Sequence, residues 1–316
     1  TTPYQLSNAQ TSLNVYGTLT ALSSEDMYAT FVVDTGLLGC RWDDSDTMWE
    51  DGTGASCLPT IGGGGESEYF DSLEEGLVGY WKMNEVSWNG TSGEVVDQTL
   101  NNYDGTRIGD ATTISSGFGK SGTFDGTGDY VSMGNVLNFG DSTDFTLSAW
   151  VNRTTFTGDD QIIAKRNSES TAEVGYLLWV DGNDGSGDLD DVRFMVSDGS
   201  DEFLIETTTT MTTSGWNLVT VVFDDDSATN STIYINGVDS KSSTTGTIAD
   251  VNSLINSVNF TIGAESDAGE PWNGYIDEVR VYDRAITGEE VAKLYQLQPD
   301  SVNIDDASDF GALRNT

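Results

Sequence analysis

An acidic, glycine-rich segment near the middle of the chain carries oxygen side chains at a spacing suited to binding a hard cation. It reads "DGNDGSGDLDD" from Asp181 to Asp191 and offers ligands at Asp181, Asn183 and Asp188. The spacing begins like a calcium loop, but the fifth position lacks an oxygen side chain and the distal Glu of an EF-hand is missing. A solvated hairpin tip is the alternative interpretation. The segment therefore predicts either a calcium site or a polar turn.

The composition points to cations as partners. The chain of 316 residues has 52 acidic and 13 basic side chains, a formal charge of -39 and no histidine. Such a charge disfavours nucleic acid and anionic membranes, and no apolar run is long enough to cross a bilayer. The sequence starts at Thr1 without Met, which predicts that a signal peptide or an initiator Met has been removed. We expect the protein outside the cell, at the cell surface or on a virion surface.

Two cysteines, Cys40 and Cys57, bracket a polar, Gly-rich stretch. A disulfide between them would close this loop in an oxidising compartment, and two buried free thiols are the alternative. Four N-x-S/T sequons permit glycosylation, although Ser- and Thr-rich chains produce such matches by chance. These sequons start at Asn89, Asn152, Asn230 and Asn259.

The leading region, residues 1–76, contains little apolar sequence. Alternating apolar and polar residues predict a strand within 12–22, and "YATFVVDTG" predicts another within 28–36. This region must pack on the rest of the chain or pair with another subunit. A strand near the N-terminus could be donated to a neighbouring copy, or it could be an extra edge strand of its own domain.

After a Gly-rich linker, many short strands alternate with turns rich in Gly, Asp, Asn and Ser, which is typical of a β-sandwich. The one helical pattern is "TGEEVAKLY", where Thr287 and Glu290 form a capping box. Val291, Leu294 and Tyr295 give this helix an apolar stripe. We expect the helix to plug one end of the sandwich.

Eight blocks occur in the order seen in laminin-G-like, or concanavalin A-like, jelly-roll domains of the bacterial type. They are "FDGTGDYV", "FTLSAWV", "IIAKR", "GYLLWV", "WNLVTVVFD", "IYINGV", "FTIGA" and "WNGYIDEVRVYDRAITGEEVAKLY". The resemblance covers residues 77–296 and leaves a tail, 297–316. It implies an all-β fold in which two antiparallel sheets pack face to face, with Ile276, Val279 and Val281 in the core.

The resemblance also implies a structural calcium ion. The family often places a calcium ligand at the position of Asp277, and Asp125 and Asp129 of "FDGTGD" are the expected companions. Calcium takes six to eight oxygen ligands, including carbonyls. The alternative is that these aspartates cap their own turns.

The tryptophans raise the question of sugar binding, because aromatic faces stack on pyranose rings. Four lie in apolar strand patterns and are expected in the core: Trp81, Trp150, Trp179 and Trp216. Three fall in polar loops: Trp49, Trp88 and Trp272. Trp272, beside Asn273, is the best candidate for ligand contact, with a packing role as the alternative.

We predict that the protein is not an enzyme. Without histidine there is no Ser–His or Cys–His dyad. The jelly-roll glucanases related by this resemblance carry their catalytic carboxylates as a Glu-x-Asp-x-x-Glu run on one strand, and we expect no such run in this chain.

The function predicted first is an extracellular structural or adhesive protein, a self-assembling surface or filament subunit that displays the laminin-G-like domain and has copies of itself as partners. The alternative is a secreted calcium-dependent module that binds a glycan or a protein. The fold alone does not decide between them.

Overall fold

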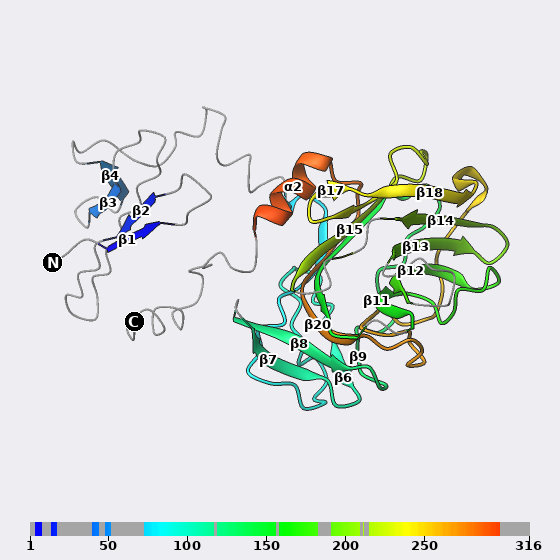
Figure 1. The fold of residues 1–316 in the computed structure, drawn as a ribbon, viewed down its shortest axis with the longest axis horizontal. Coiled ribbons are helices and arrows are strands. Elements are labelled where there is room, and N and C mark those ends of the chain that lie inside the picture. Colours follow the sequence, from blue (N-terminus) through cyan, green and yellow to red (C-terminus); the bar gives the residue numbers. More distant parts are fainter. Residues whose placement is uncertain are drawn as a thin grey trace. The chain divides into compact units, whose positions relative to one another are not determined.

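The computed structural model describes residues 73–116, 119–155, 158–182, 191–208, 211 and 215–297, and the backbone of four short strands between residues 4 and 51 (Figure 1). The chain forms two compact units, Thr1–Asp71 and Ser72–Thr316. In the described part of the chain, no helix is both long and apolar enough to span a bilayer.

The described residues of the first unit form two antiparallel strand pairs. β1 (Tyr4–Ser7) pairs with β2 (Asn14–Gly17), and β3 (Cys40–Asp43) pairs with β4 (Met48–Asp51). β2 falls within the strand predicted for residues 12–22. The strand predicted for residues 28–36 lies outside the described residues, as does Cys57, so the disulfide stays a prediction.

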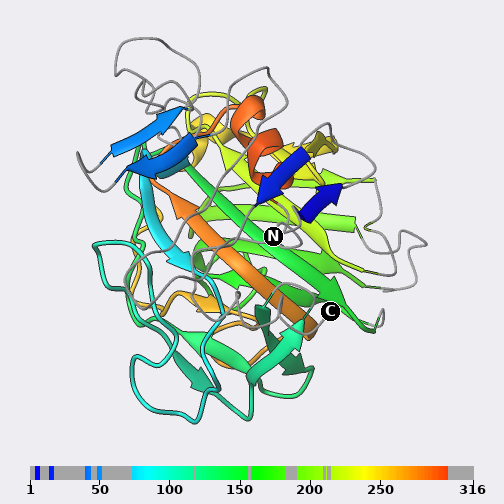
Figure 2. The ribbon, with the colours of Figure 1, turned by 90° about the vertical axis from the view of Figure 1, so that its left-hand side faces the viewer.

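The second unit is a sandwich of two antiparallel sheets, as the sequence predicted (Figure 1). In spatial order the first sheet consists of β17 (Val238–Asp239), β16 (Thr232–Ile235), β15 (Asn217–Phe223), β10 (Phe145–Arg153), β20 (Asn273–Tyr282), β8 (Gly119–Asp125) and β7 (Thr112–Ser116). β5 (Leu77–Trp81) also pairs with β20, beyond the part that pairs with β8. Figure 2 shows β20 in orange between the cyan strand β5 and the green strand β10.

The second sheet faces the first across the core. In spatial order it consists of β18 (Lys241–Gly246), β14 (Glu202–Thr207), β13 (Asp191–Asp198), β12 (Val174–Asp181), β11 (Asp160–Ala164), β19 (Thr261–Ile262), β9 (Tyr130–Ser132) and β6 (Thr106–Ile108). A 3-10 turn, η1 (Ile248–Asp250), follows β18.

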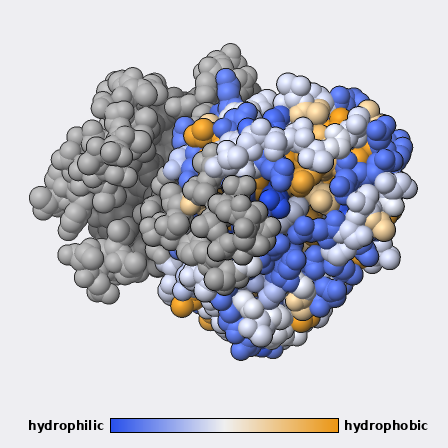
Figure 3. Space-filling model, turned by 45° about the vertical axis from the view of Figure 1, so that its right-hand side comes forward, coloured by the Kyte–Doolittle hydropathy of each residue, from blue (hydrophilic) through white to orange (hydrophobic). Residues whose placement is uncertain are grey.

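The main core lies between the two sheets and is rich in aromatic rings. Phe145 stacks on Phe139 with ring centroids 4.2 Å apart, and Trp81 stacks on Phe260 at 5.6 Å. The predicted core residues Ile276, Val279 and Val281 are fully buried here, which confirms their assignment. The face seen in Figure 3 is largely hydrophilic where its residues are described, with apolar residues scattered among polar ones.

The C-terminal helix α2 (Gly288–Gln296) has the predicted capping box, with both reciprocal hydrogen bonds between Thr287 and Glu290. The helix does not plug an end of the sandwich. Val291 and Leu294 pack on Trp150 and Tyr282, in a cluster separate from the main core. Because these residues alternate along their strands with core residues, α2 covers the outer face of the first sheet.

Of the four tryptophans expected in the core, only Trp81 lies between the two sheets, whereas Trp150 and Trp179 are buried on the outer faces of the sheets. Trp150 lies under α2, and its ring stacks on Tyr295 at 5.7 Å between centroids. Trp179 lies on the outer face of the second sheet, in a small cluster with Leu177 and Met195. Trp216 is partly buried beside the helix cluster, whereas Trp81 is in the core as predicted.

Candidate functional site

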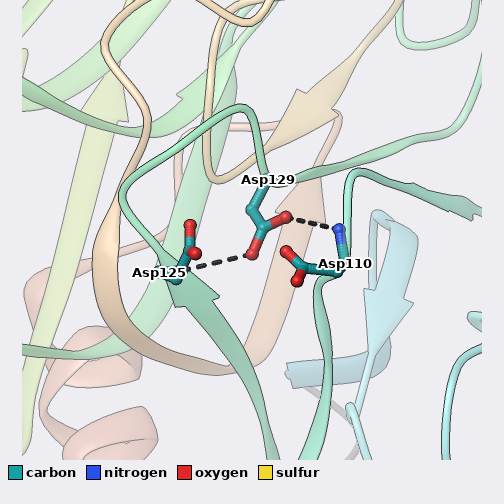
Figure 4. Close-up of side chains that lie close together, drawn as sticks. All are labelled: Asp110, Asp125 and Asp129. Atoms are coloured by element: carbon teal, nitrogen blue, oxygen red, sulfur yellow. Dashed lines mark hydrogen bonds between the residues drawn. The ribbon is translucent and has the colours of Figure 1, made fainter.

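Three aspartates lie close together at one rim of the sandwich, in the turns that follow β6 and connect β8 with β9 (Figure 4). Asp125 ends β8, Asp129 precedes β9, and Asp110 lies in the turn between β6 and β7. Each offers a carboxylate oxygen within 4.8 Å of the others. Asp110 and Asp125 are exposed, whereas Asp129 is buried. We call these three residues the rim cluster.

Asp129 ties the turns of the rim together. Its Oδ1 accepts hydrogen bonds from the backbone N–H of Asp110 at 2.7 Å and of Ala111 at 3.0 Å, and its Oδ2 accepts from Asp125 N–H at 3.2 Å. Burial raises the pKa of this carboxyl, and the N–H donors oppose the rise. Gly109 makes the approach possible, because at its φ of +74° a Cβ would lie 2.3 Å from Asp129 Oδ1. Asp129 therefore caps backbone N–H groups of its own turn and of the turn at Asp110. It also belongs to the only cluster in which two predicted ligands meet among the described residues.

Asn273, predicted to contact ligand, borders the rim cluster. It pairs with Asp125 across β8 and β20, and its Nδ2 donates to the carbonyl of Asp125 at 2.9 Å. Its Oδ1 accepts from Thr154 Oγ1 at 2.5 Å. The amide therefore fixes the position of the Asp125 turn relative to β20.

The ligand role expected for Trp272 is wrong. Its side chain has no exposed surface and belongs to the main core, so neither ring face is available to a sugar. Trp88, another loop tryptophan, is also in the core, where its ring tilts against Phe124. The side chain of Trp49 lies outside the described residues. Trp272 and Trp88 were thus assigned to polar loops because their sequence neighbours are polar, although both side chains lie in the core.

Asp277 does not join Asp125 and Asp129. The register places Asn273 opposite Asp125, and Asp277 lies four residues farther along β20, about 13 Å away along an extended strand. Its carboxyl is buried and accepts the Glu278 N–H at 2.8 Å, and this burial, together with Glu278, raises its pKa well above the ordinary range. Asp277 is thus a buried carboxyl of the first sheet rather than a rim ligand.

The acidic segment that follows β12 is described only at its ends. Asp181 is buried and forms an ion pair with Arg193 Nη2 at 2.5 Å. The carboxylate of Asp181 is thus bound to an arginine of the neighbouring strand β13. Asn183 and Asp188 lie outside the described residues, so a calcium site there stays a prediction.

A second carboxylate cluster, which the sequence analysis missed, lies at the second sheet. Asp159, Glu169 and Glu270 also offer oxygens within 4.8 Å of one another. Burial, followed by the charges of Glu270 and Asp159, raises the pKa of Glu169 to about 7. Burial and Glu270 likewise raise the pKa of neighbouring Glu265 to about 7.

One sequence signal could have pointed to part of this cluster. Residues 265–270 read "ESDAGE", which is a Glu-x-Asp-x-x-Glu run, so the expectation that the chain contains no such run is wrong. The run lies in the loop between β19 and β20 rather than in a strand, and its Ala268 and Glu270 have φ of +68° and +44°. Its carboxylates therefore do not alternate on one strand face as they would in a regular strand. Asp159 and Glu169 belong to other segments, and no local motif connects them.

The family comparison agrees with this architecture. Residues 125–292 match the family model described as the concanavalin A-like lectin/glucanases superfamily, which is more than half of the chain. The chain belongs to this laminin-G-like family, as its sequence blocks predicted.

Solved structures share the fold at low sequence identity. The binding domain of Paraclostridial Mosquitocidal Protein 1 is 17% identical, with a TM-score of 0.53 over 71% of this chain and 52% of that one. The ligand-binding domain of botulinum neurotoxin serotype D in complex with N-acetylneuraminic acid is 13% identical, with a TM-score of 0.52 over 73% and 53%. The binding domain of botulinum neurotoxin DC in complex with SialylT is 14% identical, with a TM-score of 0.50 over 71% and 52%. The chain spans about half the length of these structures, and they are binding domains. No curated protein matches the chain.

Proposed function

We propose that the second unit is a non-catalytic, lectin-like module outside the cell that binds a neutral glycan through a calcium ion held by the rim cluster. The observation that carries this proposal is the convergence of Asp110, Asp125 and Asp129 at a rim formed by loops, with two of the three carboxylates exposed. Two oxygens on opposite sides of one calcium ion are about 4.8 Å apart, so the cluster is compact enough to share an ion. Exposed coordination positions would remain for sugar hydroxyls.

The nature of the ligand follows from charge and from the structural neighbours. Two of the neighbours were solved with N-acetylneuraminic acid and with SialylT, which supports a glycan as ligand class. N-acetylneuraminic acid is anionic, however, and the charge of -39 on this chain repels anions. A neutral sugar with adjacent hydroxyl groups fits a calcium ion in this acidic surface better.

The proposal of a binding role also rests on the carboxylates near β20. A glycosidase holds one acid and one base or nucleophile at a set separation on rigid elements. Here Glu265 and Glu270 lie in a loop, and Glu270 Oε2 is engaged by the Gln161 amide at 2.6 Å. Incubation with the sugar that the module binds should release no reducing ends, and release would contradict the proposal.

Retention of neutral glycans on an array should require calcium. The double variant Asp110→Asn/Asp125→Asn should lose at least about tenfold in affinity, because it removes two charged ligands from the site. Glu74→Gln/Glu75→Gln, which removes the same charge elsewhere on the second unit, is the matched control. Retention that is equal in calcium and in chelator, or equal in the two double variants, would contradict calcium-dependent binding at the rim.

Self-assembly is the second candidate, and the strand pairs of the first unit favour it. β1 and β2 form a sheet of two strands, and the described residues add no third strand to it. A two-stranded ribbon is marginally stable by itself, so pairing with a strand of another copy would stabilise it.

Deletion of residues 1–22 tests this second candidate. The shortened protein should keep the circular dichroism spectrum of the sandwich and lose filaments or arrays seen by electron microscopy. Filaments formed equally well by the shortened protein would exclude strand addition through β1 and β2. Dispersed full-length protein would exclude assembly altogether.

A further inference from the structure

We propose that a second divalent cation of the calcium class binds at the second sheet, between Asp159, Glu169, Glu270 and the side-chain oxygen of Gln161. We call these four residues the sheet site. The sheet site shares no residue with the rim cluster, and cation binding there does not depend on glycan binding.

The sheet site is assembled by three separate segments. Asp159 immediately precedes β11. This strand ends at Ala164, and Glu169 lies five residues after that end. For their carboxylates to come within 4.8 Å, the segment after β11 must fold back along the sheet. Glu270 arrives from the loop before β20, which is fastened to β11 by the hydrogen bond from Gln161 N–H to Glu270 O at 2.9 Å.

None of the three carboxylates forms an ion pair among the described residues, although the charges of Arg193 and Arg166 act on Glu169 from farther away. Asp159 accepts the Gly182 N–H at 2.7 Å, and Glu270 accepts the Gln161 amide. Three carboxylates held this close repel one another. A divalent cation would remove this repulsion.

Two of the arginines near the site are paired with other carboxylates. Arg193 pairs with Asp181 and Glu206, and Arg153 pairs with Asp160. Arg166 forms no ion pair among the described residues, and its Nη2 donates to the Ser170 carbonyl. The charges that act most on Arg166 are those of Glu173 and Glu202, before that of Glu169. The single charge of Arg166 therefore offsets only part of the charge of the three carboxylates.

A buried amide oxygen is the second, independent sign of a ligand. Gln161 has no exposed surface, and its Nε2 donates to Glu270 Oε2 at 2.6 Å, which places the amide group beside this carboxylate. Its Oε1 is buried without a hydrogen-bond partner, and so is Oε1 of Glu169. A buried acceptor without a partner costs free energy, and a cation would satisfy both oxygens at once.

The oxygen-only ligand set favours calcium over softer metals. Carboxylate and amide oxygens are hard ligands, and calcium accepts an irregular shell of six to eight of them. The ion would connect the folded-back segment after β11 with the loop before β20. Trp179, which pairs with Gln161 across β11 and β12, would lie beside it.

Calcium titration of the chelator-treated full-length chain by calorimetry tests the proposal. Glu169→Gln/Glu270→Gln should abolish one class of bound ion, or weaken it by about tenfold or more, because two charged ligands are lost. Asp110→Asn/Asp125→Asn is the control of equal charge, and it should leave that class unchanged. If the rim cluster binds no calcium, the Asp110→Asn/Asp125→Asn variant should bind as many calcium ions as the wild type, with the same affinities. This result would contradict the rim proposal and leave the sheet site unaffected.

Two further measurements keep the test decisive. Gln161→Leu removes the amide oxygen without changing the charge, and it should weaken the same class of ion by about tenfold. Terbium bound in place of calcium should show luminescence on tryptophan excitation, and Trp179→Phe should reduce this luminescence without reducing binding. The proposal is overturned if the Glu169/Glu270 and Asp110/Asp125 variants lose binding equally, or if Gln161→Leu and Trp179→Phe both behave as wild type.

Discussion

Replacement of Trp272 by alanine should lower the free energy of unfolding by about 3–5 kcal/mol. The indole is fully buried in the main core, and its removal would leave a cavity that the rigid sheets cannot close. The backbone around it is also constrained, since Trp272 N–H donates to Gly263 O at 2.7 Å and Gly263 has a φ of +93°. Urea unfolding followed by circular dichroism measures the loss independently of tryptophan fluorescence.

Leu100→Ala is the matched control for this effect of burial. Leu100 is 98% exposed, so its truncation should change the free energy of unfolding by less than about 0.5 kcal/mol. Suppose instead that Trp272→Ala keeps wild-type stability and loses only glycan retention. Trp272 would then act as a ligand contact, contrary to its position in the core.

Arg153→Met should destabilise the protein by about 3–5 kcal/mol at pH 8. The guanidinium Nε donates to Asp160 Oδ2, and both side chains are almost inaccessible to water. Burial raises the pKa of Asp160 to about 6 even though Arg153 opposes the rise. Without Arg153, the folded state would contain a buried, unpaired carboxylate, and the pKa of Asp160 would rise further.

The sign of the pH dependence follows from this raised pKa. A carboxyl with a higher pKa in the folded than in the unfolded state binds more protons when folded, so stability falls as pH rises from about 4 through the folded pKa. The deficit of Arg153→Met should therefore be smaller at pH 5 than at pH 8. Urea unfolding at the two pH values, in chelator, measures the difference.

Arg153→Met/Asp160→Leu is the control for charge burial. It removes both charges from the same site and should recover much of the stability, because replacing a whole buried pair by apolar side chains is often neutral. A loss equal to that of the single variant would show that packing of the arginine stem, and not the unpaired carboxylate, causes the effect.

The sequence predicted the sandwich because its strands carry a local signal. Alternation and turn residues mark each strand, and Thr287 with Glu290 marks the start of α2. Alternation does not show which of two buried faces a residue takes. Both faces of the first sheet are covered, one by the second sheet and the other by α2, so Trp150 was assigned to the wrong side.

The candidate sites were less predictable, because they depend on contacts between distant segments. Asp125 and Asp129 lie in one short turn, so the sequence predicted them together. Asp110 comes close to them only because β7, which follows it, pairs with β8. Glu169 meets Asp159 only because the chain doubles back after β11. Such a reversal has no signature in composition or periodicity.

The pairing of β5 with β20 determines how the module responds to mechanical tension. The chain enters the sandwich at Leu77 and leaves its last strand at Tyr282, and these two residues are register partners. A pull on both ends therefore loads one end of an antiparallel pair and opens its hydrogen bonds one after another, as in a zipper. Arg284 stands at this point, donating to the Glu75 carbonyl at 2.8 Å and pairing with Glu290 at 2.7 Å. Of these two contacts, only the hydrogen bond to the Glu75 carbonyl joins the segment before β5 to the segment after β20. Stretching therefore loads this hydrogen bond together with the first pair of the β5–β20 ladder.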